Sequence, residues 1–170
     1  MSKPDVKGIS TKKLAAEIER IKKDKIAKSK VISLEEYRKV HKKKEPKRIL
    51  VVDDDSSTRS VLKRLFEKEG YEVLLAQDGT ELVKILETEI ITLVLLDINL
   101  PWVDGFELCK LLKEHDDLKD VPIVFISGRK SEIDKKHAFK LGAHDYITKP
   151  FNIKEISDTV RTLVNLHSAK

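Results

Sequence analysis

The fold of this chain is decided by the stretch Thr92-Leu93-Val94-Leu95-Leu96-Asp97-Ile98-Asn99-Leu100-Pro101, which is followed by Asp104-Gly105. The run from Leu93 to Leu96 is apolar without alternation, which is typical of a strand buried on both faces of a parallel sheet. A single carboxylate, Asp97, follows the run, and Pro101 then ends the strand pattern. Ligands of open α/β sheets bind outside the carboxyl ends of the strands. We therefore expect Asp97 to be a reactive carboxylate held at the rim of a sheet.

A strand followed by a helix is predicted five times along the chain from residue 48 onward. Ile49 to Val52 is a second doubly buried strand, and the stretches between strands carry apolar residues at helical spacing. Ser56 or Ser57 can cap the first of these helices, and Asn152 can cap the last. Alternating strands and helices with short connections predict a parallel sheet with right-handed crossovers and helices on both faces.

Polar groups follow four strands of this predicted sheet and would meet at one edge. They are Asp53, Asp54 and Asp55 after the first strand, Asp97 after the third, Ser127 after the fourth and Lys149 after the fifth. Crowded carboxylates repel one another unless a cation lies among them, and oxygen ligands without cysteine favour a hard ion such as Mg²⁺. A lysine and a hydroxyl beside the ion can bind a tetrahedral oxyanion. The combination predicts phosphoryl transfer onto Asp97 to give an aspartyl phosphate.

Each of these groups also has a purely structural interpretation. An Asp run after a strand commonly caps a helix, Ser127-Gly128 is by itself a turn, and Lys149-Pro150 is by itself a loop. The functional interpretation depends on convergence, because four separate strand ends each deliver a group with a part in the same chemistry.

These motifs, in this order and spacing, resemble the receiver domain of response regulators in two-component signalling. The resemblance runs from Lys47 to about Leu166 and depends on Val51-Val52-Asp53-Asp54-Asp55, Leu96-Asp97-Ile98-Asn99-Leu100-Pro101 with Asp104-Gly105, Ile126-Ser127-Gly128, and Gly142-Ala143-His144-Asp145-Tyr146-Ile147-Thr148-Lys149-Pro150-Phe151. It implies a flavodoxin-like, doubly wound α/β fold with five parallel strands in the order 2-1-3-4-5. We expect a single receiver domain over residues 47–170, similar to chemotaxis regulators, after a basic extension over residues 1–46.

The resemblance also implies which acidic residue accepts the phosphoryl group and which bind the metal ion. Asp97 would be the phosphoacceptor and, with Asp54 and the backbone carbonyl of Asn99, a direct ligand of Mg²⁺. Asp53 would hold the ion mainly through water. On this resemblance, a histidine kinase or a phosphotransfer protein would donate the phosphoryl group.

Three further residues receive roles from the same resemblance. Lys149 would pair with the phosphoryl oxygens, and Ser127 would donate a hydrogen bond to one of them and draw its loop inward. Tyr146 would be the aromatic switch that turns inward as Ser127 moves. Arg129 lies two residues beyond Ser127, where it would either shield the phosphoryl group or be a solvated loop residue.

The rest of the composition narrows the class of protein. No apolar run is long enough to span a membrane, the N-terminus has no secretory signal pattern, and Cys109 is the only cysteine. These features predict a cytoplasmic protein. No output domain is recognisable after the last predicted helix, and the only chemistry in view is the phosphorylation and dephosphorylation of Asp97. We expect output through the surface of the receiver's fourth helix, fifth strand and fifth helix, through the N-terminal arm, or through both, rather than an independent enzyme.

The N-terminal arm is strongly basic. Residues 1–48 contain 17 Lys and Arg against 7 Asp and Glu, a net charge of +10, whereas the remainder carries 17 against 22, a net charge of −5. A helix from Ser10 is predicted by the stripe Leu14, Ile18 and Ile21. A second helix is predicted by the capping box Ser33-Leu34-Glu35-Glu36 with Ile32 and Tyr37 as a hydrophobic staple.

The sequence alone leaves several possible roles for this arm: binding nucleic acid, lipid or protein, or acting only as a solubilising tail. Nucleic-acid binding gated by the receiver is the alternative function, but only Tyr37 offers an aromatic ring among the lysines. Lipid binding would need a wider apolar stripe, and a merely solubilising tail would need none. Short helices with apolar stripes favour a docking element that folds against a protein partner or across the receiver.

Overall fold

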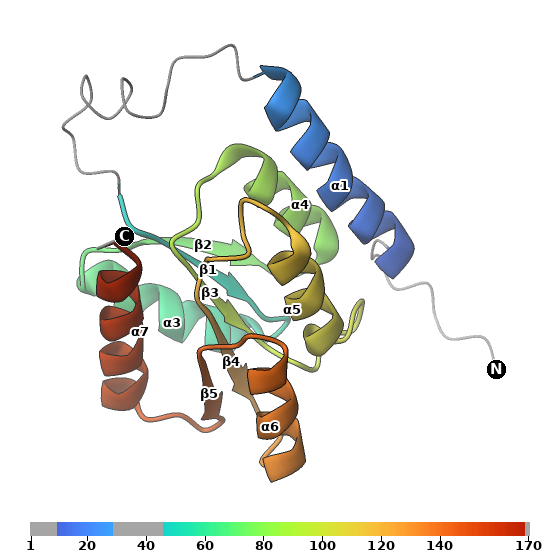
Figure 1. The fold of residues 1–170 in the computed structure, drawn as a ribbon. Coiled ribbons are helices and arrows are strands. Elements are labelled where there is room, and N and C mark those ends of the chain that lie inside the picture. The colour runs from blue at the N-terminus through green and yellow to red at the C-terminus, as the bar shows by residue number, and fades with distance from the viewer. Residues whose placement is uncertain (1–9, 29–45, 169–170) are drawn as a thin grey trace.

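The structure is a computed structural model and describes residues 10–28 and 46–168 (Figure 1). Its sheet has five parallel strands in the order β2-β1-β3-β4-β5, which confirms the predicted flavodoxin-like fold. The strands are β1 (Arg48–Val52), β2 (Glu72–Ala76), β3 (Leu93–Leu96), β4 (Ile123–Ser127) and β5 (Asp145–Thr148). The division predicted at residue 46 borders a part of the chain that the structure does not describe, and it stays a prediction.

Helices cover both faces of the sheet. The helices are α1 (Thr11–Lys28), α3 (Ser56–Lys68), α4 (Gly79–Thr88), α5 (Gly105–Glu114), α6 (Glu132–Lys140) and α7 (Ile153–Ser168). Figure 1 shows α3 and α7 on one face and α4, α5 and α6 on the other. Two apolar cores result, because β1, β3 and β4 alternate side chains between the faces and are buried on both. None of the described helices is long and apolar enough to cross a membrane.

The helix that follows β1 begins differently from the prediction. The prediction that Ser56 or Ser57 caps it was wrong, because the carboxylate of Asp55 accepts hydrogen bonds from the backbone N–H groups of Ser57 and Thr58, at 3.4 and 2.8 Å. A carboxylate at this position also interacts favourably with the positive end of the helix dipole. Asn152 does cap α7, since its side-chain oxygen accepts from the N–H of Lys154 at 2.8 Å.

The helix predicted from Ser10 is present as α1, and it packs against α4. Its stripe of Leu14, Ile18 and Ile21 is buried and belongs to the same apolar core as α4 and α5. The second predicted helix, with the capping box Ser33 to Glu36, lies outside the described residues. Part of the arm is therefore folded onto the α/β domain of the same chain, as one of the two docking alternatives expected.

Candidate functional site

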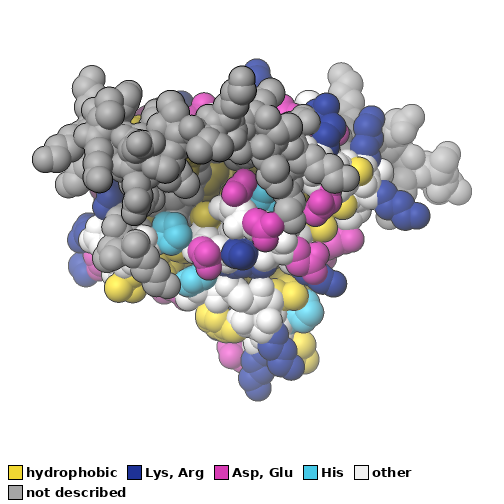
Figure 2. Space-filling model, turned by 45° about the horizontal axis from the view of Figure 1, so that its top comes forward, with side chains coloured by type: hydrophobic (Ala, Val, Ile, Leu, Met, Phe, Trp, Pro, Cys, Tyr) yellow, Lys and Arg dark blue, Asp and Glu magenta, His cyan; other side chains and the backbone are white. Residues whose placement is uncertain are grey.

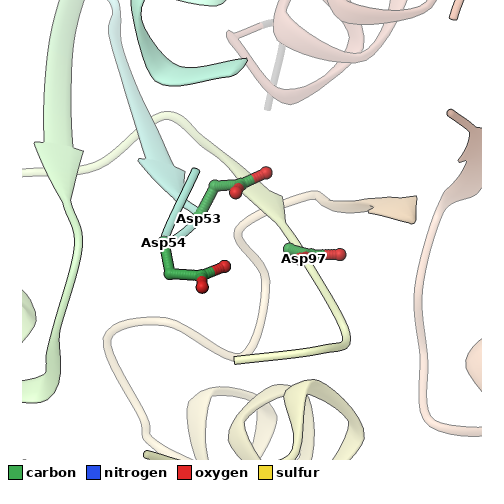
Figure 3. A group of neighbouring side chains, drawn as sticks. All are labelled: Asp53, Asp54 and Asp97. Atoms are coloured by element: carbon green, nitrogen blue, oxygen red, sulfur yellow. The ribbon is translucent and has the colours of Figure 1, made fainter. Parts of the chain in front are cut away.

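The carboxyl ends of β1 and β3 bring three carboxylates together. Val52 is paired with Leu96 in the parallel ladder, so Asp53 and Asp97 follow side by side, and Asp54 is next along the chain. Carboxylate oxygens of the three residues lie within 4.8 Å of one another (Figure 3). Asp53 and Asp97 are buried, and Asp54 is exposed. Of the acidic run, Asp55 is used as a helix cap instead.

Lys149 reaches this acidic group from the loop that follows β5. Its Nζ atom lies 2.7 Å from Oδ2 of Asp53 and 3.7 Å from Oδ2 of Asp97. Because β3 and β4 lie between β1 and β5, only a long side chain can cross the edge of the sheet in this way. The cluster thus holds three acids and one base, with a net negative charge that suits a divalent cation.

Burial governs the acidity of Asp97. Desolvation raises the pKa of this carboxyl above its ordinary value of 3.8, and the neighbouring Asp53 raises it further. Lys149 and the backbone N–H groups of Ile98 and Asn99 act in the opposite direction but do not cancel the rise. The hydrogen bond from the Ile98 N–H to Oδ1, 2.9 Å long, fixes the orientation of the carboxylate.

This raised pKa predicts that Asp97 costs stability at neutral pH. The folded chain holds the proton more tightly than the unfolded chain, so this stability contribution is present below pH 3.8 and is lost as the pH rises through the folded pKa. Without divalent cations, Asp97→Asn should therefore raise the midpoint of thermal unfolding at pH 7, by roughly 2–4 °C for each kcal/mol gained. The gain should shrink as the pH is lowered toward 4.

Asp116→Asn is the control for that measurement, because its carboxylate is exposed and pairs with Lys119 at the surface, at 3.7 Å. Calorimetry over a pH series measures the thermal midpoints of the wild type, Asp97→Asn and Asp116→Asn. A thermal midpoint of Asp97→Asn that is equal to or below that of the wild type at pH 7 would contradict the prediction.

The two predicted switch residues, Ser127 and Tyr146, are both bound to the backbone of Arg129. The Ser127 hydroxyl accepts from the Arg129 N–H at 3.3 Å, and the Tyr146 hydroxyl donates to the Arg129 carbonyl at 2.8 Å. Both side chains are buried, and the Tyr146 ring lies beside Phe125, 6.2 Å between centroids. A movement of the loop after β4 must therefore change the environment of both residues.

Arg129 is not a freely solvated loop residue. Its Nε donates to the side-chain oxygen of Asn99 at 2.8 Å, and its guanidinium lies 3.9 Å from both Asp104 and Asp134. Asn99 itself lies two residues beyond Asp97 and forms a backbone bridge with Asp104. The side-chain pair of Arg129 and Asn99 thus connects the loops that follow β3 and β4. The role of the Asn99 carbonyl as a metal ligand stays a prediction.

The sequence reasoning missed a set of polar contacts on the far side of the acids. Arg59 donates to the backbone carbonyl of Asp53 at 2.7 Å and to the side chain of Gln77 at 3.2 Å. Trp102, to which no role was assigned, donates from Nε1 to the Gln77 carbonyl at 3.1 Å. An arginine within a helix and a glutamine after a strand carry no local signal of such contacts.

Comparison with known proteins gives a consistent result for this part of the chain. Residues 49–161 match the family described as response regulator receiver domain. The aerobic respiration control protein ArcA of Escherichia coli is 44% identical over 117 residues, which cover 69% of this chain and 48% of ArcA. The chain therefore spans about half the length of this relative.

Two solved structures resemble the fold closely. A putative response regulator from Chloroflexus aurantiacus has a TM-score of 0.66 at 30% identity, covering 71% of this chain and 99% of that one. The chemotaxis protein CheY4 of Vibrio cholerae has a TM-score of 0.65 at 28% identity, covering 69% of this chain and 98% of its own. Each likeness extends over nearly all of the solved structure but only about 70% of this chain. Helix α1 lies outside residues 49–161, which the family match covers.

Proposed function

The chain belongs to the family of response regulator receiver domains, and we propose that it is a phosphorylation-activated switch with Asp97 as its phosphoacceptor. One observation carries the proposal: Asp97 lies at the end of β3 among carboxylates within 4.8 Å, with Lys149 3.7 Å away. The donor would be phosphohistidine on a histidine kinase or a phosphotransfer protein in the cytoplasm. An Asp97 oxygen would form the new O–P bond as the P–N bond breaks, and the departing imidazole would take up a proton.

The donor set fits Mg²⁺. Asp53, Asp54 and Asp97 offer only oxygen ligands, and this choice of ligand suits a hard divalent cation. When bound, Mg²⁺ would supply positive charge that offsets the negative charge of the phosphoryl oxygens. The test is incubation with acetyl phosphate: intact mass spectrometry should find one added phosphoryl group with Mg²⁺ and none with excess EDTA. Equal modification in EDTA would contradict this assignment.

We propose that Lys149 binds the phosphoryl group, because its ammonium group lies 3.7 Å from the Asp97 carboxylate. A charge-assisted contact to a phosphoryl oxygen would take Lys149 away from Asp53, and Ser127 would bind a second oxygen. That movement of Ser127 pulls on the Arg129 backbone, which also binds the Tyr146 hydroxyl. The receiver's fourth helix, fifth strand and fifth helix are α6, β5 and α7 here, and their surface would change as the output.

Lys149→Ala should uncouple phosphorylation from this output. We expect beryllofluoride, a phosphoryl mimic, to slow amide exchange severalfold across residues 127–151 in the wild type and to leave it unchanged in Lys149→Ala. Lys130→Ala, which removes an exposed lysine from the loop after β4, should behave like the wild type. The same slowing in Lys149→Ala would remove the proposed role of this lysine.

Nucleic-acid binding by the basic arm is the alternative function, and the described residues favour it less. The apolar stripe of α1 is already used in packing on α4, which is what a protein-docking element requires. Figure 2 shows described Lys and Arg side chains in several separate places, with Asp and Glu side chains near the middle of the view. We propose protein contacts for the output, and no reaction besides phosphorylation and dephosphorylation of Asp97.

A further inference from the structure

The packing of α1 adds a helix to the receiver that the family match does not include. Leu14, Ile18 and Ile21 are no more than 5% exposed, and they join one contiguous apolar core with α4 and α5. Arg20 of α1 also pairs with Glu87 of α4 at 3.1 Å. Over residues 11–21, the part of α1 whose side chains the structure describes, the other positions are partly or fully exposed, so the buried contacts of this part come from one narrow stripe.

In the structure, α4 lies between the sheet and α1. Its apolar residues are Leu82, Val83, Ile85 and Leu86. At about 100° per residue they span an arc of roughly 160°, and α4 contacts both β2 and α1. Its buried residues Leu82, Val83 and Leu86 belong to the same apolar core as the α1 stripe.

The beginning of α4 is connected to the acidic site by hydrogen bonds. The guanidinium of Arg59 donates to the backbone carbonyl of Asp53 and to the Gln77 side chain. Gln77 in turn donates from its backbone N–H and its side-chain amide to Glu81, in the first turn of α4, at 2.9 and 3.1 Å. The position of α4 is thereby tied to the position of Asp53.

A second connection runs through the loop that follows Asp97. Trp102 donates from its indole N–H to the Gln77 carbonyl, and its ring packs against the apolar core that contains the α1 stripe. Trp102 therefore connects the loop after the acceptor to the residue before the N-cap of α4, and it packs on the apolar core to which the α1 stripe also belongs.

We propose that α1 acts as a brace: its docking on α4 and the binding of a phosphoryl group at Asp97 stabilise each other. Docking immobilises α4 and, through Gln77 and Trp102, the loop after Asp97, so that less ordering remains to be done when a phosphoryl group binds. Coupling between two sites is reciprocal, so occupancy of the site must tighten the docking of α1 by the same factor. This inference rests on the proposed function, because it takes Asp97 as the place where the phosphoryl group binds.

The test compares Ile18→Asp with Ala16→Asp in the full chain. Both substitutions add one carboxylate to α1, but residue 18 is buried against the receiver and residue 16 is exposed. Affinity for Mg²⁺ and beryllofluoride, measured by calorimetric titration, should fall at least threefold in Ile18→Asp and stay unchanged in Ala16→Asp. In the wild type, the same ligand should slow amide exchange in α1.

A double substitution tests the route. Trp102→Phe keeps a ring in the core but removes the indole donor, so Ile18→Asp should weaken binding less in that background than in the wild type. If Ile18→Asp does not fold, Leu14→Ala tests the same contact with a milder change. It should also weaken the binding of Mg²⁺ and beryllofluoride. Unchanged or tighter binding in Ile18→Asp, with normal binding in the wild type, would overturn the brace. An absence of binding in the wild type would instead overturn the proposed function.

Discussion

Asp97→Ala and Asp97→Asn should both abolish phosphoryl incorporation from acetyl phosphate, with a loss of roughly two orders of magnitude or more. The reason is that each substitution removes the nucleophilic oxygen while the remaining groups of the site stay in place. Intact mass spectrometry of the wild type and the two variants, with Mg²⁺ present, gives the result directly. Asp116→Asn, with its exposed carboxylate, should be modified to the same extent as the wild type.

The geometry favours Asp97 over the other two acids of the cluster. Asp53 is bound directly by Lys149 at 2.7 Å and accepts the N–H of Asp55 at 2.8 Å. Asp54 is exposed, in the turn between β1 and α3. Asp97 lies at the end of the central strand, with one oxygen fixed by the Ile98 N–H. Equal modification of the wild type and Asp97→Ala would show that another residue is the acceptor.

Gly105→Ala should destabilise the protein by about 3 kcal/mol or more, the largest effect on stability that we expect from adding one methyl group. Gly105 begins α5, and its N–H donates to the Ile98 carbonyl at 2.8 Å. A Cβ atom there would lie 2.5 Å from Cα of Ile98 and closer still to the carbonyl oxygen of Asp97. Both contacts are with backbone, so relief requires α5 or the end of β3 to move.

Chemical denaturation measures the loss, and Gly128→Ala is the matched control. A Cβ atom at residue 128 would meet nothing within 4 Å, and its backbone φ lies outside the range that disfavours side chains. Gly128→Ala should therefore unfold at nearly the wild-type denaturant concentration. Because the clash in Gly105→Ala falls on Asp97 itself, beryllofluoride binding should weaken as well. A stability equal to that of Gly128→Ala would contradict the close approach.

The sequence alone determined the sheet and the residues at its edge. Unbroken apolar runs at Ile49 to Val52 and Leu93 to Leu96 are typical of strands buried on both faces, and their alternation with helices favours parallel strands, which the structure has. Parallel strands end at one edge, so Asp53, Asp97 and Lys149 had to converge there. These inferences depend on local pattern and on topology, and both can be read along the chain.

Only the tertiary structure decided which surfaces and side chains meet across large separations in sequence. The apolar stripe of α1 predicted a helix that packs against another surface, but the same stripe suits a protein partner or the receiver itself. The burial of the stripe in one core with α4 and the pairing of Arg20 with Glu87 settle its place. The link from Asp53 through Arg59 and Gln77 to Trp102 was likewise invisible, because each contact depends on distances between loops that no local pattern encodes.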